Sequence, residues 1–156
     1  MNNGNFELIA NVIEWGRSRG IHDQSTYLNQ INGAMAEWFE VREAIIKGKP
    51  ILEIAMEIGD VIVQMINAIM IMDNLKIFII HNVLEAEIKY PPVVEIEQET
   101  SIFLENILDG RLVLALASVR DVATVNGLEL SHCLMLAYVK IKDRKGAMKN
   151  GKWCKE

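Results

Sequence analysis

The chain has 156 residues, enough for one domain with a sizeable core. Hydrophobic residues make up 51% of it and charged residues 24%, a composition that excludes an intrinsically disordered protein. The formal net charge of -5 argues against a general binder of polymeric nucleic acid, because such proteins are basic.

The chain has two cysteines, Cys133 and Cys154. They are too few for a disulfide scaffold or a zinc finger, so a reducing cytoplasm is the expected location. The N-terminal sequence MNNGNFELIA lacks the basic segment of a signal peptide. The three histidines lie far apart and lack metal-ligand spacing. Cys133 falls in an apolar helix and is expected in the core.

Aliphatic residues and eight methionines carry most of the hydrophobicity, and this favours helices over a β-sandwich. Apolar periodicity, glycines and prolines together predict an all-α protein with a single domain over residues 1–156. The last ten residues are expected to be irregular. The predicted helices lie at about 5–18, 26–47, 51–72, 75–89, 94–108, 112–125 and 128–145.

The predicted helix at 51–72 is apolar around most of its circumference. Its polar side chains Glu57, Asp60, Gln64 and Asn67 recur at the spacing of one narrow helical stripe. The helix approaches transmembrane length, but a pair of charged residues inside a lone span is costly in lipid, so a membrane helix is not expected. The stripe is therefore expected to be buried or to line a cleft, where Asn67 is a candidate substrate contact.

The helix at 26–47 carries Glu37 and Glu40 at the same spacing, among apolar neighbours. The connection to the next helix is short, and short connections favour antiparallel neighbours. Facing stripes would bring these two acids towards Glu57 and Asp60. Four carboxylates in a poorly solvated cleft would hold cations or protonate, and an all-oxygen ligand set selects Mg²⁺ or Mn²⁺. The alternative is that each acidic pair is a solvated helix face.

The pattern Gln30-x6-Glu37-x2-Glu40, followed by Glu57-x2-Asp60, resembles the MazG-like all-α NTP pyrophosphohydrolases. That superfamily also includes all-α dUTPases and dCTPases. The segment WGRSRGI looks like the first helix of the family, and IKDRKGAMKNGKWCKE resembles an ending common in it. The resemblance covers residues 12–72 and 138–156. Residues 75–135 match poorly and are expected either to cap a nucleotide pocket or to extend a dimer interface.

The resemblance implies a helical bundle whose four-helix core is completed by oligomerisation, as a homodimer or homotetramer, with extra helices in the second half. It also implies the reaction of a (d)NTP with water to give a (d)NMP and pyrophosphate. In that reaction a metal-activated water attacks the α-phosphorus. The implied metal ligands and catalytic residues are Glu37, Glu40, Glu57 and Asp60.

Two positions depart from the family pattern: Ala36 stands where a fifth acid is common, and Gly33 where a lysine is common. Glu43 is either a substitute for that acid or a solvated residue. A nucleotide-binding protein with weak or no hydrolysis is therefore one alternative. A structural helical oligomer whose acids are surface charges is another.

The C-terminal residues 140–156 contain seven basic and two acidic residues, a local charge of +5. We expect Lys142, Arg144 and Lys145 to contact phosphates, and arginine suits bidentate phosphate contacts. The alternative is a solubilising terminus. Trp15, Trp38 and Phe39 are expected to lie in the core. The alternative is that Trp38 or Phe39, beside the acids, stacks on a nucleotide base.

Overall fold

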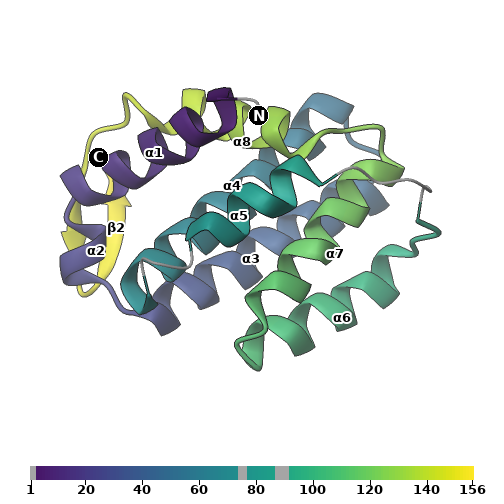
Figure 1. The fold of residues 1–156 in the computed structure, drawn as a ribbon, viewed down its shortest axis with the longest axis horizontal. Coiled ribbons are helices and arrows are strands. Elements are labelled where there is room, and N and C mark those ends of the chain that lie inside the picture. The colour runs from purple at the N-terminus through teal and green to yellow at the C-terminus, as the bar shows by residue number, and fades with distance from the viewer. Residues whose placement is uncertain (1–2, 74–76, 87–91) are drawn as a thin grey trace.

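The computed structural model describes residues 3–73, 77–86 and 92–156. This part of the chain folds into helices and one two-stranded hairpin (Figure 1). The expected all-α class is confirmed. The elements are α1 (Asn3–Ser18), α2 (Ile21–Gln24), α3 (Tyr27–Ile46), α4 (Ile51–Met72), α5 (Ile77–Glu85), α6 (Ile96–Leu108), α7 (Leu112–Val125), α8 (Leu130–Ile141), β1 (Gly146–Lys149) and β2 (Lys152–Lys155).

Most predicted helices are confirmed, and the predicted helix at 51–72 coincides with α4. The stretch between the first two predicted helices, 5–18 and 26–47, contains the short helix α2. Helix α3 begins after Thr26, whose side chain accepts a hydrogen bond from the backbone N–H of Asn29. Helix α5 ends at Glu85, earlier than predicted. Residues 75–76 and 87–89 of that predicted helix lie outside the described residues.

The end of the chain differs most from expectation. Helix α8 stops at Ile141 instead of continuing to 145, and the terminal residues form the antiparallel hairpin β1–β2. Asn150 and Gly151 connect the strands with φ angles of 51° and 74°. Two consecutive positive φ angles, with Asn-Gly, are typical of a type I′ hairpin turn. The expectation of an irregular C-terminus was wrong because this turn signal was not used.

Helices α3 and α4 form an antiparallel pair at the centre of the molecule (Figure 1). Among the described helices taken singly, only α4 is long and apolar enough to cross a membrane, and 67% of its most apolar window is buried in the fold. Helices α7 and α8 pass that test only as one span, despite a 98° bend between them. Burial of this extent is typical of a core helix, because the other helices replace water around it.

Helix α8 crosses α4 at Gly59, in the middle of α4. A Cβ atom at Gly59 would collide with the carbonyl oxygen of Cys133 and the Cβ of Ala137. The bare backbone of Gly59 therefore allows the two helices to approach closely. Cys133 is fully buried, as expected.

Replacing Gly59 with alanine is expected to lower the free energy of unfolding by about 1–3 kcal/mol, the usual cost of overpacking a core. The added methyl group would push α8 away from α4. Urea denaturation measures the effect. The matched control is Gly33→Ala, since there the nearest atoms belong to the flexible Gln64 side chain. If Gly59→Ala lowers the free energy of unfolding no more than Gly33→Ala does, the close crossing of α8 over α4 is contradicted.

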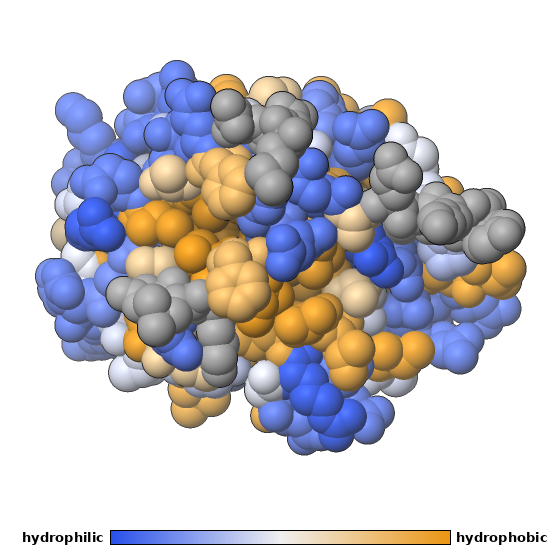
Figure 2. Space-filling view, in the orientation of Figure 1, coloured by the Kyte–Doolittle hydropathy of each residue, from blue (hydrophilic) through white to orange (hydrophobic). Residues whose placement is uncertain are grey.

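The face seen in Figure 2 gathers apolar side chains over the region where α4, α5 and α7 meet. Exposed apolar residues on these helices include Met72, Phe78 and Leu114, which are 41%, 56% and 51% exposed. An apolar groove of about 190 Å³ runs between the same three helices.

Candidate metal centre and adjoining cavity

Three of the four predicted acids come together. Glu37 of α3 faces Glu57 and Asp60, which lie three residues apart on one face of α4. One carboxylate oxygen from each can be chosen so that all three lie within 4.8 Å of one another. All three side chains are partly buried. The antiparallel pairing of α3 and α4 places these acids as the sequence predicted.

The fourth predicted acid, Glu40, is exposed and is not part of this cluster. Its charge nevertheless acts on Glu37 and Glu57. Glu43 is exposed and pairs with Lys47 one turn later on α3. Glu43 therefore does not take the place of the acid missing at Ala36.

A lysine that the sequence analysis did not use lies against the acids. Lys140 of α8 forms an ion pair with Asp60, and both side chains are largely buried, 23% and 15% exposed. The two residues are 80 positions apart in sequence. The close crossing of α8 over α4 at Gly59 brings them together. The ammonium group of Lys140 partly neutralises a site that has an excess of negative charge.

The electrostatics of the cluster favour neutralisation by protons or cations. Burial, followed by the charges of Asp60 and Glu57, raises the pKa of Glu37 to about 7. Burial also raises the pKa of Glu57 above its usual range. The pKa of Asp60 is raised by burial too, although its hydrogen bond with Lys140 and the charges of Lys140 and Arg144 oppose the shift.

A cavity of about 290 Å³ lies along the α3–α4 pair. None of the acids lines it, but Ala36, which precedes Glu37, and Gln64, one turn beyond Asp60, do. Its walls combine apolar side chains with a row of amides and with the hairpin strand β2. No residue from the described part of 77–135 lines it, so that segment does not cap this cavity. The lining residues are Trp15, Ile21, Asn29, Gln30, Asn32, Gly33, Ala36, Val63, Gln64, Asn67, Lys152 and Trp153.

Asn67 lies in the cavity wall, as predicted for the polar stripe of α4. It is 2% exposed, and its Oδ1 lies 2.9 Å from Nε2 of His22. A Cβ at Gly16 would collide with this pair, so the bare backbone of α1 makes room for it. Gln30 is 7% exposed, and its Nε2 donates a hydrogen bond of 2.9 Å to the Ser25 hydroxyl.

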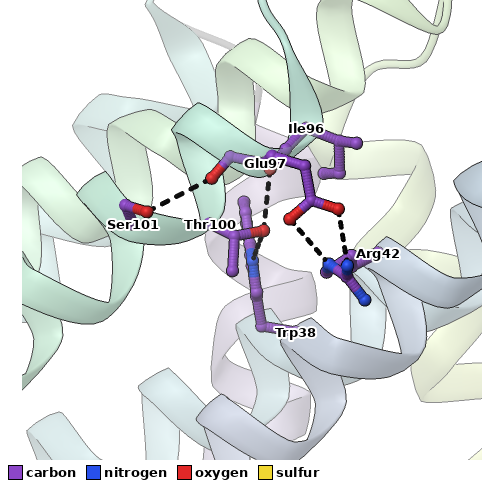
Figure 3. A network of polar contacts seen from close by, with 6 residues as sticks. All are labelled: Trp38, Arg42, Ile96, Glu97, Thr100 and Ser101. Atoms are coloured by element: carbon purple, nitrogen blue, oxygen red, sulfur yellow. Dashed lines mark hydrogen bonds and ion pairs between the residues drawn. The ribbon is translucent and has the colours of Figure 1, made fainter.

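Trp38 lies in the core, which is one of the two places expected for it. It is fully buried between α3 and α6, where its ring stacks on Phe103 with centroids 4.2 Å apart. Its indole N–H donates to the Thr100 hydroxyl at 2.9 Å, and Arg42 pairs with Glu97 beside it (Figure 3). Helix α6 covers this side of α3, so Trp38 is a core residue and the stacking prediction is wrong.

Of the other two aromatic residues expected in the core, one lies there and one does not. Trp15 is 8% exposed and lies in the core as expected. Phe39 is 46% exposed, so its expected place in the core is wrong, and the alternative that it stacks on a base stays a prediction. It follows Trp38 on α3, and the two side chains point in different directions on the helix.

Of the three predicted phosphate contacts, only Arg144 is placed near the acids. The charge of Arg144 acts on Asp60, which places this arginine near the acids. Its backbone carbonyl, like that of Lys142, accepts a hydrogen bond from the Arg19 guanidinium at 3.0 Å. Lys142 lies in a surface groove beside α1, and Lys145 is exposed. The basic segment is therefore tied to the end of α1, and Lys140 and Arg144 are its residues nearest the acids.

Two residues were missed from sequence: Trp153, which lines the cavity, and His22, which contacts the lining residue Asn67. His22 is isolated in sequence from the acidic motifs, and Trp153 belongs to the unexpected hairpin. Its ring packs edge-on against Trp15, with centroids 5.5 Å apart. The Asn-Gly pair at 150–151 was the signal that could have located the hairpin.

Comparisons with protein-family models, with curated proteins and with solved structures found no match. The resemblance to MazG-like proteins therefore stays a prediction from the two acidic motifs and the chain ends.

Proposed function

We propose that this chain is a magnesium-dependent nucleoside triphosphate pyrophosphohydrolase, with Mn²⁺ as an alternative ion. The observation that carries the proposal is the meeting of Glu37, Glu57 and Asp60 beside a cavity lined by amides. Carboxylate oxygens are the ligands that Mg²⁺ prefers, and Mg²⁺ commonly shares its coordination shell with substrate phosphates. Glu40 would complete the ligand set from the exposed side of the cluster.

When bound, the ion would neutralise phosphate charge and acidify a water molecule. Lys140 and Arg144 would contribute the protein's own positive charge to the triphosphate. The water oxygen would form a bond to the α-phosphorus as the bond to the pyrophosphate oxygen breaks. Its proton would pass to a cluster carboxylate or to solvent, because Ala36 offers no base.

Binding without efficient hydrolysis is the second candidate function. Ala36 is exposed in the wall of the cavity, next to Glu37. The position at which the resembled family often carries a fifth acid therefore faces the proposed site, where a methyl group cannot accept a proton. Tight nucleotide binding by calorimetry, without product, would favour this candidate.

The test of hydrolysis is a panel of NTPs and dNTPs incubated with Mg²⁺ or Mn²⁺ and assayed for pyrophosphate. We expect release of pyrophosphate and the monophosphate from at least one substrate, and none after chelation with EDTA. Release of single phosphates would indicate attack at the γ-phosphorus instead. No product from any nucleotide with folded protein would remove the hydrolysis claim.

Oligomerisation is part of the proposal. The exposed apolar residues where α4, α5 and α7 meet, including Phe78 and Leu114, are suited to contact a second copy. Sedimentation analysis would detect the dimer or tetramer. A structural oligomer without a site predicts that Mg²⁺ leaves the melting temperature unchanged, whereas ligand binding to the folded state must raise it.

A further inference from the structure

The contact between His22 and Asn67 determines which end of the Asn67 amide is free. An amide oxygen only accepts hydrogen bonds, so the contact of Oδ1 with Nε2 requires His22 to carry a proton on Nε2. Asn67 Nδ2 has no hydrogen-bond partner among the described residues and belongs to a side chain in the cavity wall. Asn67 therefore presents an N–H donor to any molecule in the cavity.

Gln30 has the opposite polarity. Its Nε2 is used by the Ser25 hydroxyl, so its Oε1 is the end left to accept a hydrogen bond. Both amides are almost fully buried, and each is held at one end by a neighbouring side chain. In this arrangement the cavity has a donor at Asn67 and an acceptor at Gln30, between apolar side chains that include Val63 and Ile21.

The position of Asn67 along α4 indicates which part of a nucleotide would meet it. Asn67 lies seven residues beyond Asp60, about 10 Å along the helix axis at 1.5 Å per residue. Gln64 lies between them on the same stripe. With phosphates at the acids, the far edge of the base would reach the level of Asn67, and this edge carries the exocyclic oxygen or amino group that distinguishes the bases.

Resting on the proposed function, we propose that His22 and Asn67 form a specificity device that selects nucleotides with an exocyclic carbonyl oxygen over those with an exocyclic amino group. The N–H of Asn67 donates to the carbonyl oxygen of uracil, thymine, guanine or hypoxanthine. An amino group at the same place would face the Asn67 amide donor to donor. A buried site built to donate a hydrogen bond discriminates strongly against a ligand that cannot accept it.

The test measures the binding of nucleoside monophosphates by calorimetry with Mg²⁺ present, so that it does not depend on hydrolysis. UMP with CMP, and IMP with AMP, form two matched pairs that differ in the oxo or amino group and the adjoining ring nitrogen. The wild-type protein is expected to bind the oxo member of each pair at least about tenfold more tightly, a difference of about 1.4 kcal/mol.

Two variants and one control separate the device from a general effect on the cavity. Asn67→Asp keeps the shape but replaces the donor with an acceptor, so the preference is expected to invert towards CMP and AMP. His22→Leu frees the Asn67 amide to turn, so the ratio is expected to fall towards one without inverting. Gln98→Glu makes the same amide-to-acid change at an exposed position of α6 outside the cavity and is expected to leave the ratio unchanged.

The outcomes distinguish the two claims. Binding or hydrolysis of nucleotides with no oxo preference, or with a preference that Asn67→Asp leaves unchanged, overturns the specificity device and leaves the proposed function standing. Absence of binding by any monophosphate, together with no product from any triphosphate, overturns both.

Discussion

Replacing Glu37 with glutamine should lower pyrophosphate release by on the order of 10²–10³-fold while raising the melting temperature at pH 8. Glu37 is the cluster acid whose pKa is raised most clearly, to about 7, by burial and by the charges of Asp60 and Glu57. At pH 8 the folded protein must keep this carboxylate ionised against that repulsion. Glutamine preserves the shape and removes the charge, which is expected to raise the melting temperature by about 2–4 °C.

The pH dependence of stability follows from the same shift. In the unfolded chain Glu37 titrates near its ordinary pKa of 4.5, and in the folded protein near 7. Between these values the folded state binds the proton more tightly, so without metal the stability falls as pH rises through this window. The Glu37→Gln variant should show a flatter profile between pH 4.5 and 7 in thermal melts with EDTA.

The control is Glu105→Gln, an exposed glutamate on α6 that lies outside the cluster. It should change neither turnover nor the pH profile. Asp60→Asn should lose activity without the gain in stability, because it also breaks the ion pair with Lys140. If Glu37→Gln unfolds the protein, the carboxylate is structural. If the variant keeps full activity, the carboxylate has no role in hydrolysis.

Replacing Lys140 with methionine should lower the free energy of unfolding of the metal-free protein by about 1–3 kcal/mol at pH 8. The substitution leaves Asp60 without its partner at a position where the carboxylate is only 15% exposed. The loss should be smaller than for a fully buried pair, since some solvent reaches both groups. Chemical denaturation in EDTA provides the measurement.

Magnesium should restore more stability to Lys140→Met than to the wild-type protein, because in the variant no protein cation competes for Asp60. Lys142→Met is the matched control for stability, since Lys142 is 45% exposed and lies near the exposed Asp143. In EDTA, Lys142→Met should lower the free energy of unfolding only slightly. An equal response of both variants to magnesium would show that Lys140 and the metal do not share the acids.

The part of the site that could be predicted from sequence is the part with local periodicity. Glu57, Asp60 and Asn67 share one stripe of α4, and a four-residue connection forces α3 to pair with it. Helical spacing and loop length determine both facts, and neither depends on the rest of the chain.

The parts of the site that could not be predicted from sequence depend on contacts between distant segments of the chain. Lys140 reaches Asp60 because α8 crosses α4 at a glycine, and no local pattern pairs residues 80 positions apart. The sequence left Trp38 with two places, the core or a nucleotide base beside the acids, and the choice depended on α6, which covers its side of α3. The hairpin was predictable in principle from Asn150 and Gly151, and it brings Trp153 to the cavity.

The proposed function requires Glu37, Glu57 and Asp60 to hold a divalent cation. Anomalous diffraction from crystals grown with Mn²⁺ tests it most directly. We expect a peak within coordination distance, about 2.0–2.6 Å, of oxygens from these carboxylates, with the Lys140 ammonium withdrawn from Asp60. Saturating Mn²⁺ that leaves no peak there, with Lys140 still paired with Asp60, would contradict the account.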